Sequence, residues 1–215
     1  MSMVKYNTSA GIEGEFQPGS RKRVLRNRLG ITSKQKMDEA EFEALIDSQE
    51  QHLNVVTEET IFTSRMLCQM HHAWLGGIYE WAGSYRTVEM SKSGFTWPPA
   101  SRVSTNMDVF ETGLLTRFTP FRLESMEAGC TALARVHAEF LLIHPFREGN
   151  GRMARWLTDL MCLQARLPEM NYAFVGLGSS QRKANYLQGV IQGYNQNYRP
   201  LAGFFREVLE RAATR

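Results

Sequence analysis

The sequence predicts an all-α domain that carries one small β-hairpin near residues 86–97. Apolar residues recur at helical spacing through most of the 215 residues. The periodicity fails between residues 81 and 99, where glycines and prolines punctuate short extended runs. The length suits one sizeable core. We therefore expect one domain at residues 31–215, preceded by an N-terminal arm at residues 1–30.

The expected elements follow from breakers and helix-start signals along the chain. The arm is rich in glycine and polar residues and is expected to hold at most a short helix. A first helix is expected after Thr32-Ser33, to about Gln51, and a second from Thr57 to the Gly76-Gly77 pair. After the hairpin, helical patterns occupy residues 100–115, 123–143, 150–166, 179–194 and 200–213.

Composition narrows the class of protein. The 43% hydrophobic and 22% charged residues are ordinary for a soluble globular domain, and no apolar stretch approaches the roughly 18 residues of a membrane span. Residues 1–14 contain no apolar run followed by a secretory cleavage site. The three cysteines are odd in number and widely spaced, which favours reduced thiols over a disulfide framework. We therefore expect a cytoplasmic protein.

The net charge of +3 suits an anionic ligand, but the excess is modest. The densest basic run is Arg21-Lys22-Arg23, followed by Arg26 and Arg28. Such a run can contact nucleic acid. A solvated surface of the arm is the favoured interpretation, so nucleic acid is not the expected partner.

One segment, from Ile143 to Arg155, carries the candidate chemistry. Pro145 lacks an N–H group and disfavours helix at the preceding residue, so His144 is expected at the end of a helix. The sequence Gly149-Asn150-Gly151 permits an unusual turn immediately before the next helix. Backbone N–H groups at such a turn form a cradle for an anion.

Charged side chains surround this cradle. Arg152 and Arg155 share a helix face that points back toward the helix start, where cations are poorly placed for the helix dipole unless a polyphosphate is bound. Glu148 offers a hard oxygen ligand for phosphate-bound Mg²⁺. An accessible His144, with the ordinary histidine pKa of about 6.5, suits removal of a proton from a hydroxyl. Together these residues indicate nucleotidyl or phosphoryl transfer.

The segment from His144 to Arg155 resembles the signature of the Fic family, His-x-Phe-x-[Asp/Glu]-Gly-Asn-Gly-Arg-x-x-Arg, with every specified position filled. The resemblance implies a Fic helical bundle and transfer of AMP from Mg²⁺-bound ATP to a Ser, Thr or Tyr hydroxyl of a target protein. It implies that His144 is the base, that Phe146 packs the loop into the core and that Glu148 holds Mg²⁺. It assigns phosphate contacts to Gly149, Asn150, Gly151, Arg152 and Arg155.

Two further segments resemble Fic proteins. Trp81-Ala82-Gly83, with Arg86-Thr87 after it, leads into a flap that the resemblance places beside ATP through Lys92, Ser93, Gly94 and Phe95. An extended flap can pair with the backbone of a target protein. Without the resemblance, Phe95 and Trp97 are expected as buried hairpin aromatics. The resemblance also places Asn185 and Tyr186 beside adenine, although an ordinary helix face explains them equally well.

Residues 9–14 fit the inhibitory pattern [Ser/Thr]-x-x-x-Glu-[Gly/Asn] of regulated Fic proteins. In that interpretation Glu13 pairs with Arg155 and occupies the place of the γ-phosphate. The pattern is short and its glycine-rich context is a poor helix former. The alternative is restraint by a separate antitoxin, and a homodimer is a further partner to consider.

Other functions remain open from the sequence. Transfer of UMP or another phosphate-containing group would use the same site. A nucleic-acid-binding module would use the basic arm instead. A metallohydrolase built on His71, His72 and His144 is disfavoured, because adjacent helical histidines point in different directions.

Overall fold

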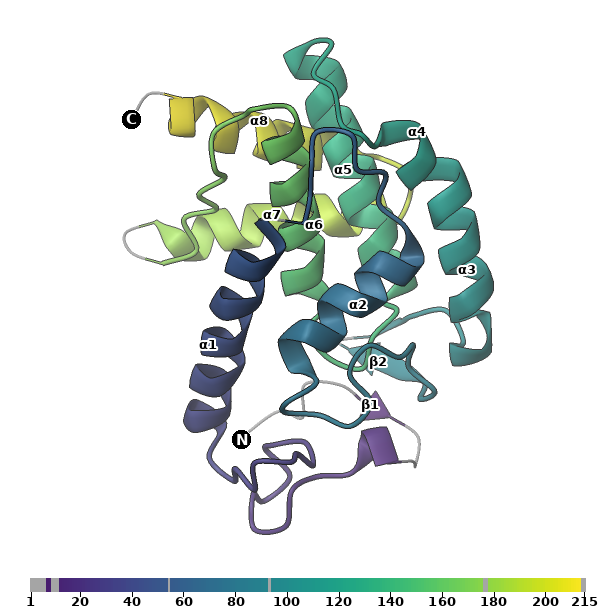
Figure 1. Cartoon of the computed structure of the whole chain (residues 1–215), viewed down its shortest axis with the longest axis vertical. Coiled ribbons are helices and arrows are strands. Elements are labelled where there is room, and N and C mark those ends of the chain that lie inside the picture. The colour runs from purple at the N-terminus through teal and green to yellow at the C-terminus, as the bar shows by residue number, and fades with distance from the viewer. Residues whose placement is uncertain (1–6, 9–11, 54, 93, 176–177, 214–215) are drawn as a thin grey trace. The chain divides into compact units, whose positions relative to one another are not determined.

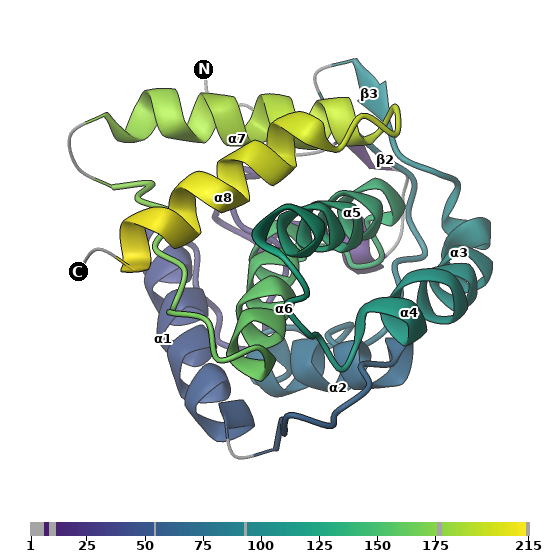
Figure 2. The same ribbon diagram turned by 90° about the horizontal axis from the view of Figure 1, so that it is seen from above.

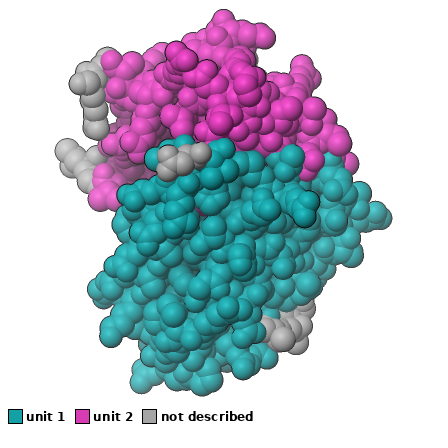
Figure 3. Space-filling view, viewed as in Figure 1, with its two compact units in different colours: residues 1–55, 63–108, 143–150 teal, residues 56–62, 109–142, 151–215 magenta. Residues whose placement is uncertain are grey.

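The structure is a computed structural model that describes residues 7–8, 12–53, 55–92, 94–175 and 178–213. The described elements are mostly helices with one small sheet, which confirms the predicted fold class (Figure 1). The chain divides into two compact units (Figure 3). Unit 1 comprises residues 1–55, 63–108 and 143–150, and unit 2 comprises residues 56–62, 109–142 and 151–215. The division into arm and domain expected from the sequence stays a prediction.

Two helices form the framework of unit 1. Helix α1, Lys34–Leu53, buries Met37, Glu41, Leu45 and Ser48 on one stripe. Helix α2, Ser64–Leu75, packs against it and is capped by Thr63, whose hydroxyl accepts the N–H of Met66 at 3.1 Å. Buried Glu41 joins the two elements, since its backbone carbonyl accepts from the Trp74 indole at 2.8 Å. This packing orients the inner face of α2 toward the candidate loop.

The predicted hairpin forms in unit 1, with a third strand added. Strand β2, Met90–Lys92, pairs antiparallel with β3, Phe95–Thr96, so the predicted flap is confirmed as a hairpin. Strand β1, Asn7–Thr8, pairs with the other edge of β2. The sequence did not predict β1, because a two-residue strand in a polar arm has no alternating apolar pattern. In the arm, residues Ile12–Gly14 form the short 3₁₀ helix η1.

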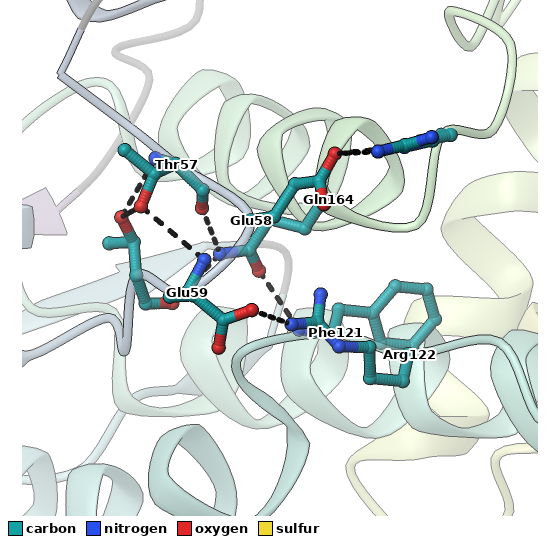
Figure 4. Close-up of polar contacts among 8 residues, drawn as sticks. Thr57, Glu58, Glu59, Phe121, Arg122 and Gln164 are labelled. Carbon is teal, nitrogen blue, oxygen red and sulfur yellow. Dashed lines mark hydrogen bonds and ion pairs between the residues drawn. The ribbon is translucent and has the colours of Figure 1, made fainter.

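The expected helix start at Thr57 is wrong, because residues 57–60 form a turn in unit 2 and the helix begins only at Ser64 (Figure 4). The side-chain oxygen of Thr60 accepts the Thr57 N–H at 2.8 Å, and the Thr57 hydroxyl oxygen accepts the Glu59 N–H at 3.3 Å. Threonine side chains that bind nearby backbone compete with helix formation. The Gln164 amide then donates to the Thr57 carbonyl at 3.0 Å, which fixes the turn.

The remaining helices agree with the predicted stretches to within a few residues. Residues 100–118 are broken into four short segments: the 3₁₀ turn η2 at Ala100–Arg102, helix α3 at Val103–Phe110, the π-helical segment η3 at Glu111–Leu115 and helix α4 at Thr116–Phe118. The longer helices are α5 at Met126–Ile143, α6 at Asn150–Gln164, α7 at Ser179–Gly193 and α8 at Arg199–Ala213.

Helices α7 and α8 cross in close contact within unit 2 (Figure 2). A Cβ at Gly189 would lie 3.1 Å from the backbone of Leu201, so the glycine permits this approach. The apolar face of α8 includes Leu201, Phe204 and Val208, all buried. Cys68, Cys130 and Cys162 are free thiols, as predicted. No helix within the described ranges has the length and apolar character needed to cross a bilayer.

Candidate active site

His144 lies at the point where α5 ends. The helix stops at Ile143, and His144 takes a left-handed backbone conformation with φ of 54°. This region is uncommon for residues other than glycine, although histidine is among the residues enriched there. Pro145 follows, as the sequence analysis predicted for a helix end. The histidine is therefore held on a sharp change of chain direction.

The side chain of His144 is more enclosed than the sequence analysis expected. Its exposed fraction is only 4%, so the expectation of an accessible imidazole is wrong for this conformation. One physical reason is Trp97, which follows β3 and places its ring 4.1 Å from the imidazole, centroid to centroid, at 33°. The Trp97 ring therefore forms a wall beside the imidazole.

The loop after His144 is closed by its own side chains. The Asn150 carboxamide accepts the Phe146 N–H at 2.9 Å and donates to the Phe146 carbonyl at 2.7 Å. Gly149 has φ of 86°, and a Cβ there would lie 2.7 Å from the Trp74 ring. Only glycine therefore combines this conformation with this contact. Asn150 is occupied with loop closure, a role beyond the phosphate contact that the signature implies.

Phe146 anchors the loop in the core of unit 1. Its ring is fully buried and stacks on the His71 ring of α2 at 3.9 Å and 5°. Nδ1 of His71 accepts the Gly83 N–H at 2.8 Å, so the proton lies on Nε2, which donates to the Glu148 carbonyl at 3.1 Å. Both ring nitrogens of His71 are thus hydrogen-bonded to backbone, one to the loop and one to Gly83, which argues against the metallohydrolase alternative.

The motif predicts Glu148 as a metal ligand, and that role stays a prediction. One carboxylate oxygen accepts the N–H of Gly149 at 2.9 Å, which orients the side chain at the head of the loop. Within the described ranges, no cluster of three or more His, Cys, Asp or Glu residues suits a metal ion. A single carboxylate fits Mg²⁺ carried in on a triphosphate, because Mg²⁺ then takes its other ligands from phosphate and water.

The two motif arginines lie in unit 2, on the first turns of α6. Both side chains are partly exposed. The guanidinium of Arg155 folds back toward the helix start, since a Cβ at Gly151 would lie 3.7 Å from its Nη1. Its Cζ also lies 5.9 Å from the ring centre of Tyr172 and 5.7 Å from that of Phe174. A cation is thus held at a helix N-terminus against two aromatic rings, an arrangement suited to an anion.

Comparison with known proteins identifies the family. The profile of the Fic/DOC family matches residues 61–162. A probable protein adenylyltransferase from Sinorhizobium fredii, y4lH, is 30% identical over 211 residues, which cover 96% of this chain and 100% of that protein. The chain belongs to the Fic/DOC family. A protein adenylyltransferase Fic from Nematostella vectensis is 25% identical over 96% of this chain, which spans 46% of that longer relative.

Solved Fic structures share the fold. BepC from Bartonella tribocorum, solved with bound AMPPNP, has a TM-score of 0.73 at 18% identity and covers 91% of this chain and 96% of its own. The Fic domain of a Bartonella quintana protein, solved with bound ADP, has a TM-score of 0.72 at 18% identity, with 91% and 94% coverage. These likenesses confirm the Fic helical bundle expected from the signature.

The Fic flap residues lie on and around the hairpin turn of unit 1. Lys92 ends β2 and is exposed, and Gly94 occupies the turn with φ of 82°. Phe95 is half-buried, and its ring meets that of Trp97 edge-on at 5.2 Å. Ser93 lies outside the described residues. Burial is thus confirmed for Trp97, whereas Phe95 is only partly buried, and a flap contact with ATP stays a prediction.

The two residues that the Fic resemblance places beside adenine differ in their surroundings. Asn185 is exposed, and its carboxamide oxygen accepts from Gln181 one turn earlier on α7 at 2.9 Å. Tyr186 is buried, its hydroxyl lies 2.7 Å from Nε2 of His137, and its ring packs against Phe174 at 5.1 Å. Asn185 is the one whose side chain faces solvent, so the two do not form one surface.

Glu13 of the Fic inhibitory pattern is bound within unit 1. Its carboxylate accepts the Thr87 N–H at 3.0 Å and the Thr87 hydroxyl at 3.2 Å. Its backbone carbonyl accepts from Arg147 Nε at 2.6 Å. The residues Ser9, Ala10 and Gly11 of the pattern lie outside the described residues. Glu13 thus connects the arm to the Fic loop through Arg147, a position that the signature leaves unspecified.

Sequence reasoning missed three residues that shape the Fic loop. His71 was considered only as a metal ligand, Arg147 only as a variable position, and Arg86 only as part of a family segment. Each is buried and polar. The contacts that reveal them join residues far apart in the chain, such as Arg86 and His144. Burial of a charged or polar side chain was the signal, and it becomes visible only in the structure.

Behind Arg155, helix α6 carries a buried carboxyl. Burial raises the pKa of Asp159 to about 7 from an ordinary value of 3.8, although the Tyr172 hydroxyl, 2.9 Å away, and Arg155 lower it. Between pH 3.8 and 7 the folded state therefore binds more protons than the unfolded chain, so this group makes the fold less stable as pH rises.

We expect Asp159→Asn to remove this dependence. The variant and the parent should have similar urea midpoints at pH 4, and the variant should have the higher midpoint at pH 8. The buried His137, whose pKa burial lowers to about 3, contributes the opposite slope in both proteins and cancels from the difference. A midpoint for the variant that is lower than the parent's at pH 8 would contradict the assignment.

Proposed function

We propose that this Fic protein is a protein adenylyltransferase, which transfers AMP from Mg²⁺-bound ATP to a Ser, Thr or Tyr hydroxyl of a target protein. The observation that carries the proposal is the complete signature from His144 to Arg155, placed on a helix end, a closed loop and a helix start. The curated relatives named protein adenylyltransferase support it, as do the AMPPNP and ADP in the related Fic structures.

The proposed reaction assigns one task to each motif group. His144 accepts the proton of the acceptor hydroxyl, whose oxygen attacks the α-phosphorus of ATP. The bond from the α-phosphorus to its bridging oxygen breaks, pyrophosphate leaves and AMP stays on the target as a phosphodiester. Arg152 and Arg155 stabilise the negative charge that develops on the leaving pyrophosphate. Glu148 would hold Mg²⁺, which when bound neutralises part of the triphosphate charge.

The loop supplies the phosphate cradle in this proposal. The backbone N–H groups of Gly149, Asn150 and Gly151 stand at the start of α6, where the helix dipole favours an anion. Of Asn185 and Tyr186, the two residues assigned to adenine, Asn185 has its side-chain amide at the surface of α7. In this proposal the hairpin registers the target backbone, as an extended edge can.

The experiment that tests the proposal uses ATP labelled on different phosphates. Incubation of the purified protein with a cell lysate and α-labelled ATP should label protein bands, whereas γ-labelled ATP should label none through this enzyme. Labelling from the γ position would indicate phosphoryl transfer instead. Stronger labelling from α-labelled UTP would favour the alternative of UMP transfer by the same site.

We also propose that Glu13 restrains the enzyme. The sequence pattern of residues 9–14 supports this role, and Glu13 is buried beside Arg147 of the motif loop. In the inhibitory mechanism the carboxylate leaves Thr87 and pairs with Arg155, so that the γ-phosphate has no place. The alternatives are a separate antitoxin, with Glu13 only anchoring the arm to Thr87, and control through a homodimer.

Two substitutions at Glu13 distinguish inhibition of the enzyme from mere attachment of the arm to Thr87. Glu13→Gly should increase auto-AMPylation with ATP and Mg²⁺ several-fold. Glu13→Gln keeps an oxygen that can accept the Thr87 hydrogen bonds but loses the charge needed for an ion pair with Arg155. If Glu13 inhibits the enzyme, both variants should gain activity. An unchanged rate in both would leave Glu13 as an anchor and favour an antitoxin.

A further inference from the structure

One buried arginine of unit 1 binds backbone on both sides of the candidate base. Arg86 follows the Trp81-Ala82-Gly83 segment and is only 2% exposed. Among the described residues, its guanidinium donates hydrogen bonds to four backbone carbonyl oxygens. A buried guanidinium whose hydrogen bonds within the described residues go to carbonyls is unusual, because buried charges are normally hydrogen-bonded to carboxylates. The carbonyls that it binds show what the charge stabilises.

Arg86 makes three contacts where α5 ends, two from its guanidinium and one from its backbone N–H. Nε of Arg86 donates to the His144 carbonyl at 2.8 Å, and Nη2 donates to the Ile143 carbonyl at 3.4 Å. The backbone N–H of Arg86 donates to the Pro145 carbonyl at 2.8 Å. Carbonyls at a helix C-terminus lack helical partners and favour a nearby cation. Arg86 therefore satisfies three consecutive carbonyls across the residue with φ of 54°.

The other end of the guanidinium holds the stems of the hairpin. Nη1 donates to the Val88 carbonyl at 2.9 Å, and Nη2 donates to the Pro98 carbonyl at 2.6 Å. Val88 precedes β2, and Pro98 comes directly after Trp97, whose ring lies against the imidazole of His144. The planar fork of an arginine fixes the directions of all these bonds together. One side chain thus sets both the backbone of His144 and the wall beside its ring.

We propose that Arg86 is a positioning residue, which fixes the His144 backbone and the Trp97 wall in one geometry so that the imidazole is aligned for proton removal. This inference rests on the proposed function, in which His144 is the base. Arg86 touches neither nucleotide nor acceptor hydroxyl in this role. Burial lowers its pKa, while Glu89 and Glu13 raise it, and an arginine retains its charge under such a shift.

Arg86→Lys tests the role with the charge retained. A lysine ammonium is a point charge that cannot satisfy both ends of the fork. We expect kcat for auto-AMPylation to fall about a hundredfold, the scale of a misplacement of about 1 Å, while KM for ATP changes little. Arg86→Met should lower kcat further. The matched control is Arg26→Lys, an exposed arginine paired with Glu15, which should keep the rate of the parent.

A second readout does not depend on activity. In protein labelled with ¹³C at histidine, His144 should give one imidazole Cε1–H signal, which Arg86→Lys should shift or split while the signal of His52 stays in place. In the unsubstituted protein, the Nε–H of Arg86 should exchange with solvent far more slowly than that of Arg26. The exchange measurement needs no variant, so it applies even where a substitution prevents folding.

The outcomes separate this inference from the proposed function. If the protein labels no target with any nucleotide, the proposed transferase activity is refuted. The His144 NMR signal and the exchange rate of the Arg86 Nε–H would still test the positioning role. Arg86→Lys with unchanged kcat and an unchanged His144 signal would overturn the inference. Exchange of the Arg86 Nε–H as fast as that of Arg26 would also overturn it.

Discussion

Replacing His144 with alanine is expected to reduce AMP transfer by about 10²- to 10⁴-fold, the range that a general base contributes. The substitution removes the imidazole that takes the proton from the acceptor hydroxyl, and it leaves the Gly-Asn-Gly turn and both motif arginines unchanged. The measurement is incorporation of α-labelled AMP under single-turnover conditions, with parent and variant at equal concentration.

His52→Ala is the matched control for that experiment. His52 lies near the C-terminal end of α1, far along the chain from the motif, and its Nδ1 lies 2.8 Å from the Ser48 carbonyl one turn earlier, so its loss should leave transfer unchanged. The His144 variant should still bind a non-hydrolysable ATP analogue with an affinity within about threefold of the parent's, since the base contributes mainly to the transition state. Equal rates for parent and His144→Ala would remove His144 as the base.

Much of the fold could be predicted because the signals of its helices are local in the sequence. Helix α1 was expected after Thr32-Ser33, to about Gln51, and runs over Lys34–Leu53, because apolar spacing and a start signal are both local properties. The turn at residues 57–60 escaped prediction, because Gln164 fixes it from a distant part of the chain. Strand β1 escaped prediction for a similar reason, since its existence depends on the free edge of β2.

The candidate site divides in the same way. The motif from His144 to Arg155 is contiguous, so its helix end, its turn and the charged side chains beside them could be identified in the sequence. The cover over His144 was not, because Trp97 reaches it from the hairpin. The supports of the loop also lie far from it in the chain, since His71 binds Glu148 and Arg86 binds His144. Long-range contacts of this kind have no periodic signature.

Gly149→Ala is expected to destabilise the protein and to abolish nucleotide binding. The residue has φ of 86°, which disfavours any side chain, and its new Cβ would lie 2.7 and 2.9 Å from two carbons of the Trp74 ring. The left-handed backbone and the overpacking should together cost roughly 2 to 5 kcal/mol of unfolding free energy. Urea denaturation measures this loss, and unchanged stability would show that the loop has another conformation.

Gly151→Ala is the comparison that gives this result its meaning. Gly151 lies in the first turn of α6. A Cβ added there would lie 3.7 Å from Nη1 of Arg155, which is an ordinary contact. The fold should therefore keep its stability or gain up to about 1 kcal/mol from helix propensity. If the backbone here approaches phosphates, the added methyl group should still weaken ATP binding. A stable variant with undiminished ATP affinity would contradict the phosphate cradle. A stable variant that binds ATP poorly would indicate that Gly151 is needed for ligand binding, whereas Gly149 is needed for the fold.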